Sequence, residues 1–201
     1  MRVTVIDYKA GNLTSVLKTL RHLGAETIVT DGDLGLVESA ERIVLPGVGH
    51  FAATERLDAT GLTSAIRAAI ERNVPFLGIC VGMQWLYAGS SEAPSQPGLA
   101  HFTESCARFS DSKEKVPHVG WNSLEVRSGS RLLADVEPGE YVYFTHSYKA
   151  PVTADTAATT YYIEPFAAAV ERGNVMGAQF HPEKSGATGL KILGNFLKWK
   201  G

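Results

Sequence analysis

Cysteine is scarce in this chain. Only Cys80 and Cys106 occur among its 201 residues, and no CxxC pair is present. Two cysteines are too few for a disulfide scaffold, and zinc sites of the common kinds need paired cysteines or histidines at short spacing. We therefore expect two free thiols, a cytoplasmic location and no metal site.

The chain also lacks an excess of charge of either sign and any long apolar run. Its 19 basic and 21 acidic residues leave a formal net charge of −2, so we expect neither nucleic acid nor an anionic membrane as a partner. No run approaches the ~18 apolar residues of a spanning helix. The first residues, MRVTVIDYKAGN, reach Asp7 without the long apolar region of a signal peptide.

Strand and helix patterns alternate through the first half. The spacing of apolar residues predicts helices over residues 11–24 and 51–72, the second broken near Gly61. Strands that are apolar on both faces and joined by helices indicate a parallel sheet covered on both sides. The apolar runs that predict such strands are residues 2–7, 26–31, 42–47 and 74–79.

The second half has short strand-like segments separated by turns, and a final helix pattern over residues 189–200. The predicted strands here are residues 114–127, 140–150, 157–163, 167–172 and 175–180. We expect a single α/β domain over residues 1–201, because 201 residues that are 44% hydrophobic can bury one sizeable core. Its central sheet should be mainly parallel and flanked by helices, with an antiparallel extension.

Cys80 stands where a predicted strand meets a predicted helix, in the sequence GICVG (78–82). This is the G-x-nucleophile-x-G form of a nucleophile elbow, in which Gly78 and Gly82 remove collisions around a strained residue. The N–H group of Val81 could then donate to an oxyanion on the attacked carbonyl. Alternatively, Cys80 is an ordinary buried cysteine, and the pattern alone leaves the two interpretations about equal.

A cysteine nucleophile needs a base and a group that orients the base. His181 follows an apolar strand in GAQFHPEKS, and Pro182 favours extended backbone at His181. In an extended segment Glu183 would lie on the same side as His181 and could hold its imidazole. A polar loop at the end of a strand is the alternative. The remaining histidines lack an acid at useful spacing or lie on a helix: His22, His50, His101, His118 and His146.

A third feature follows the strand at 42–47. The sequence PGVG places Gly47 and Gly49 on either side of Val48, so that backbone N–H groups could face an oxyanion or turn away from it. A tight strand-to-helix turn is the simpler interpretation. However, the carboxyl ends of parallel strands meet at one edge, where α/β proteins bind ligands, and all three features are predicted at such ends.

The chain resembles the class I glutamine amidotransferases, whose fold is flavodoxin-like, and within them the glutaminase subunits of imidazole glycerol phosphate synthase from histidine biosynthesis. The resemblance runs along nearly the whole length. It is carried by DYKAGNL (7–13), PGVGHF (46–51), GICVGMQWL (78–86), PHVGWN (117–122), YFTHSY (143–148) and QFHPEKS (179–185).

The resemblance implies hydrolysis of glutamine to glutamate and ammonia without metal or organic cofactor. Cys80 would be the nucleophile, His181 would move protons and Glu183 would orient it. The residues implied to bind glutamine are Gln84, Glu92, His146, Ser147 and Tyr148. The oxyanion hole would comprise Gly47, Val48, Gly49 and Val81.

The ammonia would pass to a cyclase subunit with a (β/α)₈ barrel fold, in a heterodimer that makes imidazole glycerol phosphate and an aminoimidazole carboxamide ribotide. The residues implied to contact that partner are Asn12, Trp121, Asn122 and Lys184. Trp121 could equally be a core aromatic residue, and Lys184 an ordinary solvated lysine.

Two departures from the family pattern stand out. Lys9 occupies a position where the family usually has glycine, and residues 98–109, which include Cys106, deviate from the usual sequence. We interpret Cys106 as structural. The alternatives are the glutaminase of anthranilate or pyridoxal phosphate synthesis, a cysteine peptidase, or a non-catalytic regulatory protein that keeps the fold.

Overall fold

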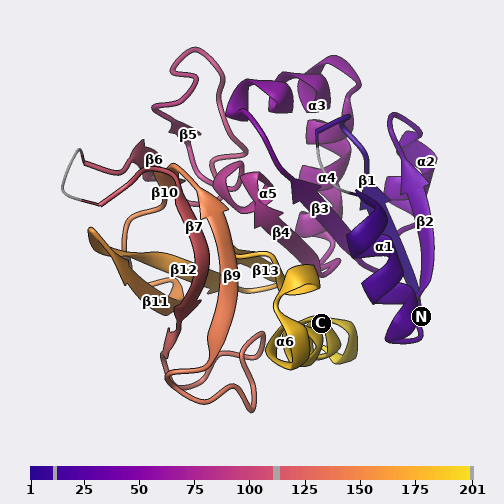
Figure 1. Ribbon diagram of the computed structural model, residues 1–201. Coiled ribbons are helices and arrows are strands. Elements are labelled where there is room, and N and C mark those ends of the chain that lie inside the picture. Colours follow the sequence, from indigo (N-terminus) through magenta and orange to yellow (C-terminus); the bar gives the residue numbers. More distant parts are fainter. Residues whose placement is uncertain (11–12, 111–113, 200–201) are drawn as a thin grey trace.

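The computed structural model describes residues 1–10, 13–110 and 114–199. Its main sheet has eight strands in the order β2-β1-β3-β4-β13-β12-β11-β8 (Figure 1). The strands are β1 (Arg2–Ile6), β2 (Glu26–Thr30), β3 (Ile43–Gly47), β4 (Phe76–Cys80), β5 (Gly89–Ser90), β6 (Ser105–Arg108), β7 (His118–Ser123), β8 (Glu125–Val126), β9 (Tyr141–His146), β10 (Tyr148–Lys149), β11 (Thr156–Tyr162), β12 (Glu164–Arg172) and β13 (Val175–Ala178). The helices are α1 (Leu13–His22), α2 (Leu34–Glu38), α3 (Glu55–Ala59), α4 (Leu62–Glu71), α5 (Val81–Gln84) and α6 (Gly186–Lys198), with 3₁₀ turns η1 (Phe51–Thr54) and η2 (Pro182–Lys184).

The predicted fold class is confirmed. Strands β2, β1, β3, β4 and β13 are parallel, whereas β12, β11 and β8 continue the sheet in antiparallel fashion. β3, β4 and β13 are buried at every residue, as expected for strands covered on both faces. Helices α1 and α6 lie on one side of the sheet, and α2, α3 and α4 on the other (Figure 1).

The helices follow the apolar periodicity of the sequence. In α4, Leu62, Ala65, Ile66 and Ala69 form the buried face. Gly61 precedes this helix with a φ of 78°, a left-handed conformation that glycine adopts without strain, and it separates α3 from α4 where the sequence predicted a break. No helix of the described part of the chain is long and apolar enough to cross a membrane.

Parts of the second half differ from the prediction. The predicted strand at residues 114–127 is only β7 and β8, and β7 leaves the main sheet to pair with β9 in a separate two-stranded ribbon. The short helix α2 was not predicted because residues 34–38 are too few for a periodic pattern. It is stabilised by Asp33, whose side chain accepts hydrogen bonds from the N–H groups of Gly35 and Leu36.

The topology brings three strand ends together. β4 lies between β3 and β13, and in the β3–β4 register Gly47 stands beside Cys80. β13 runs parallel to β4 and ends at Ala178, three residues before His181. The predicted convergence at the carboxyl edge of the sheet is therefore confirmed.

Candidate active site

Cys80 occupies a strained elbow between β4 and α5. Its backbone has φ 54° and ψ −110°, a conformation that costs a non-glycine residue about 1–3 kcal/mol. A Cβ atom on Gly78 would lie 2.4 Å from the carbonyl oxygen of Gly82, and one on Gly82 would lie 1.9 Å from that of Leu45. Only glycine fits at both positions, as the elbow pattern predicted. Val81 begins α5, so its N–H group has no acceptor within the helix.

His181 and Glu183 form a buried pair beside this elbow. Nδ1 of His181 lies 2.8 Å from Oε1 of Glu183, and their side chains are 1% and 3% exposed. Burial lowers the pKa of His181, but the favourable interactions of its charged form with Cys80 and Glu183 outweigh burial and raise the pKa to about 9. Nε2 of His181 has no hydrogen-bond partner among the described residues. Because Glu183 engages Nδ1, Nε2 is the nitrogen that can exchange a proton with the sulfur.

The sequence predicted that His181 and Glu183 lie together, but the extended backbone that it predicted for residues 181–183 was wrong. His181 is extended, with φ −98° and ψ 94°, whereas Pro182–Lys184 forms the 3₁₀ turn η2. The turn, rather than the alternation of an extended strand, brings Glu183 back to His181. The backbone of His181 is held by β9, since its N–H group donates to the carbonyl of Tyr143 at 2.9 Å. Ser185 Oγ also donates to the His181 carbonyl at 2.6 Å.

Two glutamine side chains of the protein extend the network around Cys80. Nε2 of Gln179 lies 3.6 Å from the Cys80 sulfur, and Oε1 of Gln179 accepts from Nε2 of Gln84 at 3.0 Å. The amide of Gln84 also donates to the carbonyl of Tyr148 at 3.0 Å. Gln179 received no role from the sequence, although it belongs to the QFHPEKS motif.

A cavity of about 180 Å³ opens at the sulfur. All five residues that the resemblance assigned to glutamine binding line this cavity. They come from the end of α5, the loop after β5 and the β9–β10 segment. The lining residues are Gly49, Cys80, Val81, Gln84, Glu92, Pro117, Thr145, His146, Ser147 and Tyr148. The cavity is below the ~300–1,000 Å³ of drug-sized sites, so a small polar molecule suits it better.

Comparison with known proteins shows the family of this chain. The family model of class-I glutamine amidotransferases matches residues 4–199. Imidazole glycerol phosphate synthase subunit HisH of Deinococcus radiodurans is 45% identical, covering 98% of this chain and 93% of that protein. The subunit HisH of Methanopyrus kandleri is 44% identical, covering 98% of both chains. The chain belongs to the class-I glutamine amidotransferase family, in its HisH group.

Another relative and two solved structures extend the comparison. The chloroplastic imidazole glycerol phosphate synthase hisHF of Arabidopsis thaliana is 43% identical to this chain. The match covers 97% of this chain and 34% of that longer protein. A crystal structure of a glutamine amidotransferase superposes with a TM-score of 0.77 at 19% identity, covering 98% of this chain and 97% of that one. The structure of PurLQS from Thermotoga maritima superposes with a TM-score of 0.75 at 22% identity, covering 98% of this chain and 97% of that one. These two likenesses support the class-I amidotransferase fold.

The two glycines of the PGVG segment differ in their surroundings. A Cβ atom on Gly47 would lie 2.1 Å from the hydroxyl oxygen of Tyr8 and 2.9 Å from Cβ of Val81, so close packing requires glycine there. Gly49 has φ 100° and open space around its Cα. Conformational freedom next to Val48 therefore lies on the Gly49 side, whereas the prediction allowed it on both sides. The Tyr8 hydroxyl is buried without a hydrogen-bond partner among the described residues, and burial raises its pKa.

Three of the four residues assigned to a partner surface, Trp121, Asn122 and Lys184, lie in or against the β7–β9 ribbon. Trp121 in β7 is 54% exposed, so its interpretation as a core residue is wrong. Its ring contacts that of Tyr143 across the β7–β9 ribbon, with centroids 6.1 Å apart, and Nζ of Lys184 lies 5.8 Å from the Tyr143 ring. Asn122 lies next to Trp121 in β7. Asn12 lies outside the described residues.

The two departures from the amidotransferase pattern are compatible with the fold. Lys9 has φ 63°, the left-handed conformation that the usual glycine favours, and its N–H and ammonium groups are both held by Asp7. Cys106 is buried, and burial raises the pKa of its thiol. Its sulfur lies 4.0 Å from the carbonyl oxygen of Gln84, outside the catalytic cavity.

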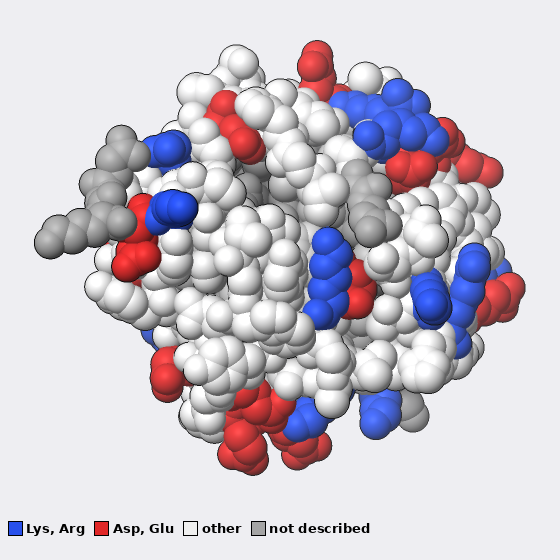
Figure 2. All heavy atoms as spheres, in the orientation of Figure 1, with Lys and Arg blue, Asp and Glu red and all other residues white. Residues whose placement is uncertain are grey.

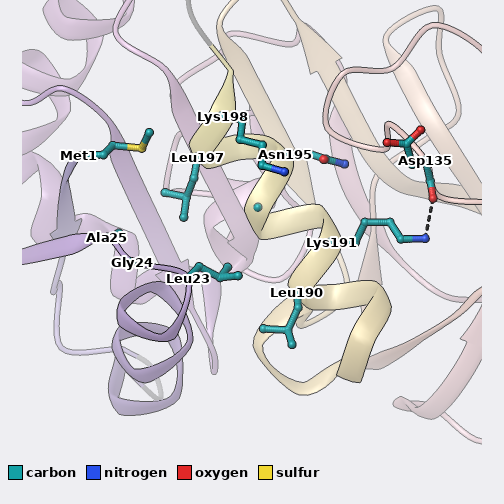
Figure 3. Close-up of a pocket in the computed structure, with 11 residues that line it drawn as sticks. Met1, Leu23, Gly24, Ala25, Asp135, Leu190, Lys191, Asn195, Leu197 and Lys198 are labelled. Carbon is teal, nitrogen blue, oxygen red and sulfur yellow. Dashed lines mark hydrogen bonds between the residues drawn. The ribbon is translucent and has the colours of Figure 1, made fainter.

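A larger hollow of about 340 Å³ lies at the amino ends of β1 and β2, between α1 and α6 (Figure 3). Leu23, Leu190 and Leu197 form its apolar wall, and Lys191 at its rim is hydrogen-bonded to the carbonyl of Asp135 (Figure 3). None of the described residues that line it is a cysteine, serine, threonine or histidine. In the part of the chain that the structure describes, no cluster of three or more His, Cys, Asp or Glu could hold a metal ion.

Proposed function

We propose that this HisH-type amidotransferase, acting as one domain, hydrolyses glutamine at Cys80 and delivers the ammonia to a cyclase subunit. The observation that carries the proposal is the meeting of three elements at one sheet edge: the strained Cys80 elbow, the buried His181–Glu183 pair and the polar cavity. The HisH relatives support the assignment to histidine biosynthesis, because two of them match at 44–45% identity over nearly full length.

The first half of the reaction forms a thioester. Nε2 of His181 takes the thiol proton, and the thiolate of Cys80 attacks the side-chain carboxamide carbon of glutamine. The negative oxygen that develops is stabilised by the N–H of Val81 and by an N–H of the segment 47–49. His181 then gives its proton to the leaving nitrogen, so that ammonia departs and a γ-glutamyl thioester remains on Cys80.

The second half reverses the roles. His181 takes a proton from water while the water oxygen attacks the thioester carbon, and the proton returns to the sulfur as glutamate leaves. Glu183 stays bonded to Nδ1 throughout and stabilises the imidazolium, as an orienting carboxylate does in other acyl-transfer triads. The raised pKa of His181, about 9, favours its imidazolium form, which can donate a proton to the leaving nitrogen.

The cavity residues would hold the amino-acid part of glutamine. Glu92 can pair with the substrate ammonium, and its Oε2 already accepts from the N–H of Phe51 at 2.8 Å, which holds the carboxylate at the rim. His146, Ser147 and Tyr148 also line the cavity. This arrangement leaves the carboxamide end of glutamine next to Cys80.

The cyclase would dock over the β7–β9 ribbon. Trp121 and Tyr141 of the ribbon, and Tyr161 of the neighbouring strand β11, are more than half exposed. Figure 2 shows a largely uncharged surface over β7 and β9. Exposed aromatic residues on uncharged surface are typical of interface centres. Thr145 of this ribbon has its carbonyl 3.9 Å from the Cys80 sulfur, so the same element borders the catalytic cavity.

We expect the cyclase to be a (β/α)₈ barrel that forms a heterodimer with this chain, as the family resemblance implies. The Arabidopsis relative supports a joint arrangement, since about two thirds of its length lies beyond the part that this chain covers. The products would be imidazole glycerol phosphate and an aminoimidazole carboxamide ribotide.

The chain alone should be a poor glutaminase. Gly49, in open space with φ 100°, allows the N–H of Val48 or Gly49 to turn toward or away from the oxyanion, and a partner could select the productive orientation. Losing one oxyanion donor typically costs about 10²–10³ in turnover. A resting state without this donor would prevent waste of glutamine when no acceptor for ammonia is bound.

The test is glutamate release by the chain alone, with the cyclase, and with the cyclase plus its nucleotide ligand. We expect turnover to rise stepwise by a total of about 10²–10³. Equal turnover in all three would refute the gated oxyanion, and no release in any of them would refute the glutaminase. Co-purification with an anthranilate or pyridoxal phosphate synthase subunit instead of a cyclase would support the alternative amidotransferases.

A further inference from the structure

Two buried histidines outside the triad are joined to each other. Nδ1 of His118 lies 3.1 Å from Nε2 of His146. His118 is 3% exposed and His146 is 6% exposed. The ring of His118 stacks on Phe144 and Tyr162, with centroids 4.8 and 4.1 Å apart. Burial lowers the pKa of His118 to about 4 and that of His146 to about 3. Both imidazoles are therefore neutral at physiological pH.

The partners of this pair determine where each proton resides. Nδ1 of His146 lies 2.9 Å from the carbonyl oxygen of Tyr148, which can only accept, so this nitrogen carries the proton. Nε2 of His146 is then an acceptor, and Nδ1 of His118 must be the donor. Nε2 of His118 is an acceptor in turn, and Nδ2 of Asn122 faces it at 3.4 Å. Both rings thus hold the Nδ1–H tautomer.

The outer end of the chain of hydrogen bonds is fixed by backbone groups. The amide of Asn122 donates to the carbonyl of Tyr161 at 3.0 Å, and its oxygen accepts from the N–H of Ser123 at 2.9 Å. These two bonds leave one orientation for the Asn122 amide. Asn122 lies beside Trp121 of β7, which is 54% exposed, and Tyr161 of β11 is 69% exposed, so this end lies at the surface where β7 meets β11.

The inner end reaches the catalytic sulfur. The Tyr148 carbonyl that accepts from His146 also accepts from Gln84, and Gln84 holds Gln179 against Cys80. Each link is a donor–acceptor contact of 2.9–3.6 Å. Four of the six links join residues at least 28 positions apart, whereas His146–Tyr148 and His118–Asn122 are local. Reversing any one amide or tautomer would place two donors or two acceptors face to face.

We propose that His118 and Asn122 are positioning residues that, through His146, hold the Tyr148 carbonyl and Gln84 in the geometry that binds glutamine. The inference rests on the proposed glutaminase function and adds to it two residues that do not touch the substrate. We call this chain of hydrogen bonds, which runs from Asn122 through His118, His146, the Tyr148 carbonyl, Gln84 and Gln179 to Cys80, the relay. Its outer end lies at the proposed partner surface. Movement of Asn122 on docking therefore reaches the glutamine cavity through defined hydrogen bonds.

Packing alone does not account for the arrangement. A purely apolar core would accept phenylalanine at position 118, since Phe144 and Tyr162 offer flat ring faces to it. Replacing His118 by phenylalanine would leave the buried Nε2 of His146 without a donor, which typically costs ~1–3 kcal/mol. The His146 ring could recover a partner only by rotating, which would break its bond to Tyr148.

The first test is ¹⁵N NMR of the imidazole nitrogens in the wild-type chain. We expect protons on Nδ1 of both His118 and His146, and no protonation of either ring between pH 8 and pH 5. The Nδ1–H form is the less common tautomer of a neutral histidine side chain in water, so finding it in both rings would report these hydrogen bonds. A proton on Nε2 of either ring, or titration near pH 6.5, would overturn the proposal.

The second test compares variants in the complex with the cyclase. His118→Phe keeps the ring stack but removes both hydrogen bonds, and its KM for glutamine should rise about tenfold with kcat little changed, because the relay supports binding. His118→Asn keeps a donor where Nδ1 stood, and its KM should stay close to that of the wild type. His101→Phe is the control, because the half-buried His101 ring lies against Phe102 outside the relay.

A wild-type KM in His118→Phe would overturn the proposal, as would equal rises in His118→Phe and His118→Asn. Failure of the glutaminase assignment has a different signature, namely no hydrolysis by the wild-type complex. If a variant does not fold, the tautomers measured in the wild-type chain still decide for or against the relay.

Discussion

Replacing Gly82 by alanine should displace the nucleophile. A Cβ atom there would lie 1.9 Å from the carbonyl oxygen of Leu45 and 3.3 Å from Leu45 Cγ. The carbonyl belongs to the interior of β3, between two parallel neighbours, so it cannot rotate out of the way. Real Cβ contacts stay beyond 3.0 Å, so α5 must move away from β3 by about 1 Å. Cys80, the residue before α5, must move with it.

The effect should be large in both stability and activity. Overpacking typically costs ~1–3 kcal/mol, and a clash with fixed backbone belongs at the upper end, about 3 kcal/mol. For a chain of this length each kcal/mol lowers Tm by about 2–4 °C, so we expect Tm to fall by about 6–12 °C. A misplacement of about 1 Å at a reacting atom can reduce turnover by ~10²-fold.

The assay is thermal unfolding by circular dichroism together with glutamate release in the complex. Gly194→Ala is the matched control, because its Cβ would meet no atom within 4 Å in the interior of α6. Alanine is favoured over glycine in helices by roughly 0.5–1 kcal/mol, so this variant should gain stability and keep its turnover. A Gly82→Ala variant with the Tm and turnover of the wild type would refute the packing argument for the elbow.

Three further outcomes are expected. Cys80→Ala should abolish glutamine hydrolysis and leave the Tm and ammonia-dependent synthesis by the complex intact; near-normal glutaminase activity would exclude Cys80 as nucleophile. His181→Asn should reduce kcat more than Glu183→Gln, since the histidine moves protons and the glutamate orients it, with general acid–base catalysis contributing about 10²–10⁴-fold; the reverse order would contradict the assigned roles. The pKa values of His118 and His146, about 4 and 3, lie below the ~6.5 of an unfolded histidine, so the unfolded state binds protons first as pH falls. Their contribution to stability is full above about pH 6.5 and is lost as pH falls toward 4; the urea midpoint should drop between pH 7 and pH 5, and by less in His118→Phe.

The sequence determined the features that depend on neighbours along the chain. Gly78 and Gly82 flank Cys80 at the end of an apolar run, and both glycines prove sterically necessary. Apolar spacing likewise predicted the parallel strands and the break at Gly61. The His181–Glu183 pair was also found, although the turn η2 forms it and not an extended strand.

Only the tertiary structure decided which distant residues meet. Gln179 contacts Cys80 across 99 positions, and His118 contacts His146 across 28, so no local pattern could assign them a role. The separation of β7 from the main sheet, which exposes Trp121, likewise depends on pairing with β9 and not on the apolar pattern of β7 itself. Local periodicity determines which side chains can be buried together, whereas the order of strands in space determines which hydrogen-bond partners they find.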